Sequence, residues 1–234
     1  MLGLFGMLVG IAALIYLMNA LASWWEYGRR LGRDNLDRYN DQLLPYWEVG
    51  EHHEIAVNAP ASTAYAAARM LDIEQSIIVR LIFWLRQFIM RAPRAPDDIR
   101  RPFIERAKAL GWAVLVDIPG RRTVLAAVTR PWQRAVTFIP LSGVDFLAFN
   151  QPGYAKIIWA IEVHPDGEGR SIATTETRVQ LTDPVSRRRF RLYWALLSPG
   201  ILAIRYISLR LIRRQAENWT ALTGPGSAMS RGAY

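Results

Sequence analysis

One hairpin pattern constrains the fold of this chain more than any other feature. Residues 154–183, YAKIIWAIEVHPDGEGRSIATTETRVQLTD, alternate apolar and polar side chains on both sides of a glycine-containing turn. Ile157, Trp159 and Ile161 share one face of the first half, and Thr175 and Thr177 share one face of the second. The pattern predicts two antiparallel strands that turn at residues 166–169, in a sheet with one apolar face and one solvated face.

A long amphipathic helix is predicted directly after this hairpin. Asp183 followed by Pro184 is the preferred pair for an N-cap and a first helical position. The apolar stripe that follows includes Phe190, Trp194, Leu197 and Ile201. The residues outside the stripe include Arg188, Arg189 and Arg191. Because Pro199 lies inside the predicted helix, we expect a kink or a break there.

Shorter elements precede the hairpin. A strand is expected from Glu51 to Val57, followed by a helix that Ser62 caps. Residues 103–111 predict a short helix, residues 112–130 a hairpin that turns at 119–120, and residues 144–150 a short strand. The segment 74–91 is helical but very apolar, and two interpretations remain open: a buried helix, or an interfacial helix beside a membrane anchor.

The order of these elements is a strand, two or three helices, about six antiparallel strands and one long helix, which is an α+β class. The segments HEIAVNAPASTAYAAARML, YAKIIWAIEV with SIATTETRVQL, and TDPVSRRRFRLYW together resemble the helix-grip fold of the SRPBCC superfamily, which includes START-like and polyketide-cyclase-like proteins. The resemblance covers residues 51–217. It implies a curved antiparallel sheet wrapped around the long C-terminal helix and a pocket for an apolar ligand. Members range from lipid carriers to cyclases, so the fold alone does not choose a function.

The N-terminal segment predicts a membrane anchor. Residues 2–25, LGLFGMLVGIAALIYLMNALASWW, carry no charged side chain, and about 20 apolar residues suffice to cross a bilayer as a helix. Arg29, Arg30 and Arg33 follow this run, which by the positive-inside rule places the remaining chain in the cytoplasm. The expectation is a single-pass protein of the cell (inner) membrane. A cleaved signal peptide is the alternative, because Ala20-Leu21-Ala22 resembles a cleavage site.

The expected domain organisation follows from these patterns. Residues 1–25 form the transmembrane anchor, 26–49 a juxtamembrane linker, 50–217 the helix-grip domain and 218–234 a disordered tail.

The charge balance points to anionic partners. The net charge is +9 and is carried mostly by arginine, which favours lipid headgroups or nucleic acid. Nucleic-acid binding needs aromatic and arginine side chains together on an exposed face. Trp159 and Trp194 are expected in the core, away from the arginines, so we expect no nucleic-acid partner. The absence of cysteine excludes disulfides, thiolate metal sites and cysteine nucleophiles.

Motifs that would define an enzyme are missing from the sequence, and we predict no cofactor and no metal. Residues 51–54, Glu-His-His-Glu, resemble a metal cluster, but on a strand their side chains alternate between the two faces. Glu176 and Arg178 are expected on the solvated face, in a cross-strand ion pair with Lys156 or Glu162 of the neighbouring strand. Glu176 or Asp117 would be the carboxylate of an enzyme if either faced the pocket.

The leading hypothesis is therefore a membrane-anchored protein that binds a lipid-like or other apolar small molecule. The alternatives are a cyclase or dehydratase acting on a polyketide-like substrate, and a non-catalytic membrane assembly partner. The predicted ligand-cavity residues are Ile157, Trp159, Ile161, Thr175, Thr177, Phe190, Trp194, Leu197 and Ile201. The residues predicted to meet anionic headgroups are Arg29, Arg30, Arg33, Arg188 and Arg191.

Overall fold

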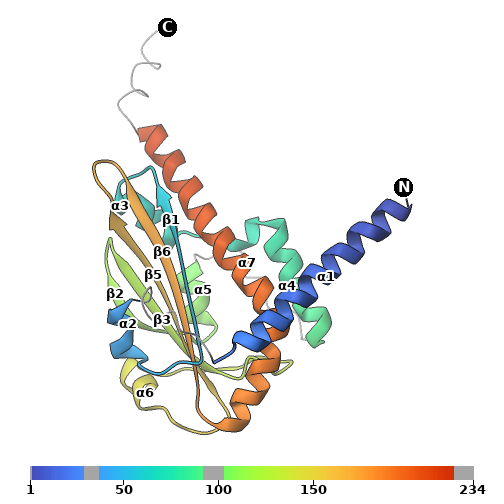
Figure 1. Ribbon diagram of the computed structural model, residues 1–234. Coiled ribbons are helices and arrows are strands. Elements are labelled where there is room, and N and C mark those ends of the chain that lie inside the picture. Colours follow the sequence, from blue (N-terminus) through green and yellow to red (C-terminus); the bar gives the residue numbers. More distant parts are fainter. Residues whose placement is uncertain (1, 29–36, 92–102, 224–234) are drawn as a thin grey trace.

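The protein is an open antiparallel sheet with helices on both faces and one long C-terminal helix (Figure 1). The computed structural model describes residues 2–28, 37–91 and 103–223. The sheet has the order β1-β6-β5-β3-β2, and β4 pairs with β3. Its strands are β1 (Val49–Val57), β2 (Ala113–Ile118), β3 (Arg122–Thr129), β4 (Phe138–Ile139), β5 (Ala155–Pro165) and β6 (Ser171–Leu181). The expected α+β class is confirmed.

Both expected hairpins are present. In the β5–β6 hairpin, Trp159 lies opposite Thr177 and Ile161 opposite Thr175, so these four side chains share one face. Gly167 and Gly169 in the turn have positive φ angles, which explains why glycine stands at these positions. The second hairpin joins β2 to β3 around Gly120.

The helix α7 (Pro184–Thr223) lies across the inner face of the sheet, where it packs on β1 and β6, and it also contacts α1 and α3. The Asp183 carboxylate accepts the backbone N–H groups of Val185 and Ser186, so the expected N-cap is confirmed. A kink or a break was expected at Pro199. The helix does not break there, since it is continuous from Pro184 to Thr223. Figure 1 shows it changing direction where α1 crosses it. The helices α3 (Ala61–Arg69) and α5 (Phe103–Ala109) cover the remainder of this face.

The outer face of the sheet is covered as well, which corrects the expectation of a solvated face. The helices α2 (Arg38–Leu43) and α6 (Gly143–Ala148) lie on it, as the lower left of Figure 1 shows. Leu44 and Phe146 are buried there against Val124, Val128 and Ile158. Lys156, on the same face, donates to the carbonyl of Leu147 at the end of α6.

Two local expectations were wrong. Residues 144–150 do not form a strand, because Ser142 caps a helix there by accepting the backbone N–H of Asp145. Ser62 does not cap α3, which begins at Ala61 with Pro60 at the N-cap position and no side-chain cap bond. The helix at 103–111 was expected, and Gly111 terminates it with a φ of 98°.

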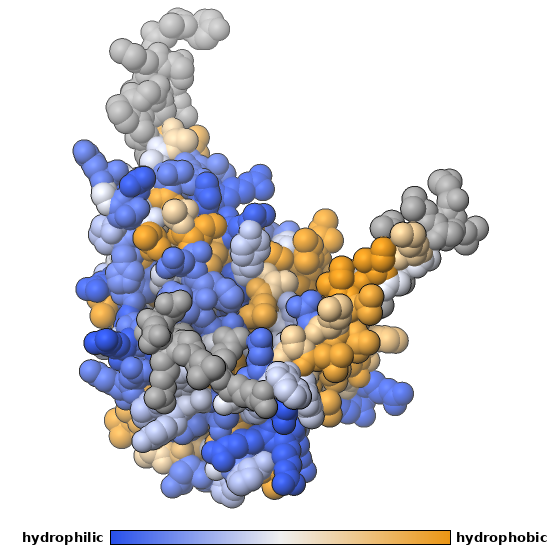
Figure 2. Space-filling model, viewed as in Figure 1, coloured by the Kyte–Doolittle hydropathy of each residue, from blue (hydrophilic) through white to orange (hydrophobic). Residues whose placement is uncertain are grey.

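Two apolar helices, α1 (Leu2–Glu26) and α4 (Ile77–Met90), pack against the middle of α7. The N-terminal half of α1 stands away from the rest of the molecule, and Figure 2 shows apolar surface along α1 and on the neighbouring helices. A short 3-10 helix (Ile73–Gln75) precedes α4. Among the described residues, the helix that is long and apolar enough to cross a membrane is α7, and 28% of its apolar stretch is buried.

Candidate functional site

The nine predicted cavity residues all come from the inner face of the sheet and the facing side of α7. Six of them, Trp159, Ile161, Thr175, Thr177, Phe190 and Trp194, are buried, and Ile157, Leu197 and Ile201 are partly buried. They divide between two packed clusters: Trp159 and Ile161 pack with α3 and the C-terminal half of α7, whereas Phe190 and Trp194 pack with Val179 and Leu181. Side chains of the protein itself therefore occupy much of the helix–sheet interface.

A cleft of about 210 Å³ opens beside Trp194, where α1, β1 and α7 meet. The lining residues are Asn19, Ala22, Ser23, Glu26, Tyr27, Glu48, Val49, Glu51, Trp194 and Leu202. Its apolar wall consists of Trp194, Leu202 and Val49, and the remainder is largely polar. Such a combination of an apolar wall and a few polar groups is typical of a site that orients a ligand with one polar end.

Three contacts position the walls of this cleft. The hydroxyl groups of Ser23 on α1 and Ser198 on α7 lie 2.9 Å apart, and the ring of Tyr27 packs on that of Phe190. The Glu48 carboxylate accepts the backbone N–H of Leu181, which fixes it at the end of β6. Burial raises the pKa of the Tyr27 hydroxyl, which is protonated at neutral pH even at its ordinary pKa.

A half-buried arginine lies on the same face. The guanidinium of Arg205 stacks on the ring of Trp159, 3.6 Å from its centroid. Burial lowers the pKa of Arg205 to about 9, although the nearby charge of Glu51 raises it. Trp159 is thus buried as expected but is not separated from the arginines. Its indole N–H donates to the Thr175 hydroxyl at 2.6 Å.

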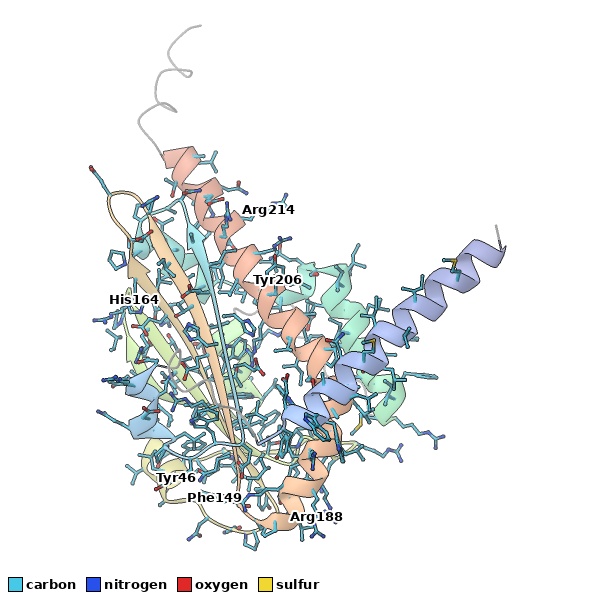
Figure 3. All side chains as sticks on the ribbon, in the orientation of Figure 1. Tyr46, Phe149, His164, Arg188, Tyr206 and Arg214 are labelled. Carbon is cyan, nitrogen blue, oxygen red and sulfur yellow. The ribbon has the colours of Figure 1, made fainter. Side chains whose placement is uncertain are left out.

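A second hollow lies at the other end of α7. It has a volume of about 520 Å³ and lies between Ile55 of β1 and the α7 residues Tyr206, Leu209 and Arg214. Figure 3 shows Tyr206 and Arg214 on this half of α7, far from Arg188 at the beginning of the helix. Arg213 is paired with Glu217 at 3.1 Å, so part of the positive charge at this groove is neutralised within the helix.

Glu176 and Arg178 lie on the outer face, as expected, but they are buried, and they pair with each other rather than with Lys156 or Glu162. Arg178 donates to the Glu176 carboxylate at 2.7 Å and to the carbonyl of Asp37, and Glu176 accepts the Asp37 N–H and the side-chain amide of Asn40. Burial would raise the pKa of the Glu176 carboxyl, but hydrogen bonds from His52 and Asp37 and the Arg178 charge lower it. A carboxylate held ionised in this way is a structural anion and a poor general base.

Asp117, the other candidate carboxylate, is also neutralised by its neighbours. It accepts hydrogen bonds from Arg69 at 2.8 Å, from the Tyr65 hydroxyl and from the Thr123 hydroxyl. Its burial opposes ionisation, but these donors lower the pKa of Asp117 below its ordinary value. No observation in the described part of the chain favours an acid–base role for either carboxylate.

The histidine pair occupies opposite faces of β1, as the alternation predicts. His52 lies 3.4 Å from Glu176 on the outer face, and His53 lies 3.9 Å from Glu51 on the inner face. The hydrogen bond to Glu176 raises the pKa of His52. Among the described residues, no group of three His, Cys, Asp or Glu side chains could hold a metal ion.

The arginines predicted to meet headgroups fall into two sets. Arg29, Arg30 and Arg33 lie outside the described residues. Arg188 is exposed at the first turns of α7, whereas Arg191 donates to the backbone carbonyl of Trp24 and stacks on its ring, 4.3 Å from the centroid. Arg191 therefore holds the C-terminal end of α1 on α7.

Several cleft residues were absent from the sequence-based prediction, chiefly Asn19, Ser23, Tyr27 and Leu202. Asn19 and Ser23 interrupt the apolar run of the predicted anchor four residues apart, which places them on one helix face. That spacing was the available signal for a helix contact at this point.

The open antiparallel sheet and the long helix across its inner face define a helix-grip-type α+β fold with an additional outer layer. No protein-family model and no curated protein matches the chain.

Solved structures with a related arrangement include a conserved protein from Geobacillus kaustophilus, with 10% identity over 74% of this chain and 95% of that chain and a TM-score of 0.33. A norcoclaurine synthase point mutant from Thalictrum flavum, in complex with a transition state analogue, has 14% identity over 74% and 96% and a TM-score of 0.30. CalU16 from Micromonospora echinospora has 13% identity over 74% and 87% and a TM-score of 0.25. Because these values are low, the class rests on the topology of this chain itself.

Proposed function

We propose that the protein is a membrane-anchored binding protein that holds one end of a lipid-like molecule in the cleft between α1, β1 and α7. The observation that carries the proposal is the position of the cleft. It lies where the apolar helix α1 meets the helix–sheet interface, and Trp194 forms part of its wall. A lipid-like molecule that moves along α1 out of a bilayer arrives at this point first.

The anchor is the apolar helix α1. Its 25 residues extend over about 37 Å, which exceeds the bilayer hydrocarbon thickness of about 30 Å. Large apolar side chains such as Leu14, Leu17 and Met18 are exposed along it, and a soluble protein has no reason to present them to water. By the positive-inside rule, the arginines after α1 place the sheet in the cytoplasm at the inner membrane.

The size of the cleft defines how much of the ligand is enclosed. A volume of about 210 Å³ is below the usual range of about 300–1,000 Å³ for sites that enclose a small molecule. The cleft therefore binds a head group or the end of a chain, and the remainder of the ligand stays against apolar helix surface. Binding of this kind serves presentation or delivery of a lipid and requires no catalytic residue.

Leu202→Trp tests the assignment of the cleft, because the larger side chain fills it. The wild-type protein, purified in mild detergent, is expected to carry co-purifying lipid that mass spectrometry of the organic extract identifies. Leu202→Trp is expected to lose most of that lipid. The control is Leu222→Trp, which makes the same change at an exposed position of the same helix.

Equal lipid content in Leu202→Trp and the control would show that the cleft is not the site. Absence of specific lipid from the wild-type protein would remove the proposed function altogether. Loss of lipid from Arg214→Glu alone would move the site to the groove at the other end of α7.

A further inference from the structure

The outward face of α4 is apolar over its whole length, which is the reverse of an ordinary surface helix. Its exposed side chains include Ile77, Ile78, Leu81, Trp84, Leu85 and Phe88. At about 100° per residue these six fall within one arc of the helix. Ile77 is 72% exposed and Phe88 is 70% exposed, so the described part of the protein leaves this arc largely uncovered.

Positive charge borders this apolar arc. Arg80 and Arg91 are exposed and project at one edge of it, next to Arg134, whose guanidinium donates to the Arg91 carbonyl. None of these three arginines takes part in an ion pair within the described ranges. An apolar arc bordered by arginine is complementary to the boundary between acyl chains and anionic headgroups.

The underside of α4 attaches it to the same part of α7 that α1 contacts. Ile82 lies directly over Gly200, where no side chain separates the two helices. The Arg86 side chain lies near the Tyr193 hydroxyl. On the other side, Ser23 of α1 meets Ser198. Since Ser198 and Gly200 are neighbours, the two apolar helices are fixed close to one point of α7.

The length of α1 places this point at the membrane surface. A span of about 20 residues uses most of the 25 residues of α1, so the spanning part extends into its C-terminal half. That half already contacts α7, since the Tyr16 hydroxyl donates to the Leu196 carbonyl. If α1 crosses a bilayer, the part of α1 that remains outside is too short to hold the middle of α7 away from the bilayer surface. In the view of Figure 1, α4 runs across the direction of α1, as expected of a helix in the membrane plane.

We propose that α4 is a second membrane contact, an interfacial helix whose arc from Ile77 to Phe88 is immersed at the boundary between headgroups and acyl chains. This inference rests on the proposed anchoring through α1 and deepens it. With two contacts, the domain is docked on the bilayer in one orientation. The cleft beside Trp194 then opens at the depth of the lipid headgroups.

The chain contains no cysteine, so single-cysteine variants of the full-length protein report on one site each. Leu81→Cys, with Ile77→Cys as a second position on the same arc, is labelled with the environment-sensitive fluorophore NBD. Leu14→Cys reports on α1, and Val144→Cys, exposed on α6 at the opposite face of the sheet, is the aqueous control. The proteins are reconstituted into vesicles of phosphatidylcholine and phosphatidylglycerol.

The proposal expects a blue-shifted emission at residues 81 and 77, quenching by a headgroup-proximal nitroxide lipid, and protection from aqueous iodide. The label at 144 should show the opposite behaviour. Iodide access at both α4 positions, with a lipid-quenched label at residue 14, overturns the interfacial helix and leaves the anchor intact. Protection at α4 without lipid quenching overturns it in favour of a protein partner. Iodide access at residue 14 would remove the anchor itself.

Discussion

Arg178 lies at the centre of the outer face of the sheet and is fully buried, although an arginine on an alternating strand is ordinarily solvated. Its three nitrogens reach Glu176, Asp41 and the backbone carbonyls of Asp37 and Leu44. Arg122 makes a similar arrangement with Glu162 and Asp37. The segment before β1 is therefore attached to the sheet by paired, hydrogen-bonded charges.

We predict that Arg178→Met lowers the free energy of unfolding by about 3–5 kcal/mol, because it leaves the buried Glu176 carboxylate without its partner. Thermal unfolding in detergent, followed by circular dichroism, measures the loss. Arg213→Met is the matched control: it breaks the half-exposed pair with Glu217 and should cost about 0–1 kcal/mol. Equal effects of the two substitutions would contradict a structural role for the buried network.

At the scale of elements, the contact between α4 and α7 depends on one glycine. A Cβ atom at position 200 would lie 2.9 Å from Cγ2 of Ile82, closer than a non-bonded contact allows. Gly→Ala inside a helix ordinarily stabilises it by about 0.5–1 kcal/mol. At Gly200 we predict the opposite sign, a net destabilisation of about 1–3 kcal/mol, because the added methyl group forces the two helices apart.

Hydrogen exchange identifies where this loss occurs. Gly200→Ala should raise exchange at the amides of residues 77–90 while the strands stay protected. Gly10→Ala is the control, since a Cβ atom there meets nothing within 4 Å. In the double variant Gly200→Ala/Ile82→Ala the clash is absent, so the amides of α4 should be better protected from exchange than in Ile82→Ala alone. Unchanged exchange in α4 of Gly200→Ala would mean that this contact does not position the helix.

Sequence-based prediction was accurate mainly where the interactions join residues close in the sequence, and it failed mainly where they join residues far apart. The β5–β6 hairpin and the Asp183 cap depend on neighbouring residues, and both were predicted. The 144–150 segment was wrong because a single capping bond from Ser142 outweighs its strand-like composition. Alternation assigned Glu176 and Arg178 to one face but could not show that α2, more than 130 positions away, covers it. The cleft escaped prediction because three separate segments form it.

At the scale of the whole molecule, both elements that flank residues 29–36 are held in place. Helix α1, before this segment, is attached to α7, and α2, after it, is attached to the sheet. Arg191 and Ser198 hold the end of α1, and Arg178 and Arg122 hold Asp37. Helix α1 and the sheet are therefore attached to the rest of the molecule on both sides of this segment. If α1 spans the membrane as proposed, the domain does not swing freely beneath it, which is what the proposed presentation of a lipid in one orientation requires.

Membrane sidedness is the last prediction, and it concerns the molecule as a whole. Arginines on the C-terminal side of α1 should retain the sheet in the cytoplasm. In intact cells with a permeabilised outer membrane, Val144→Cys should react with a membrane-impermeant maleimide only after lysis. Replacing Arg29, Arg30 and Arg33 by glutamate removes the retention signal and should produce a fraction that is labelled before lysis. Immediate labelling of Val144→Cys with all three arginines present would invert the proposed orientation and place the cleft beside Trp194 at the outer leaflet.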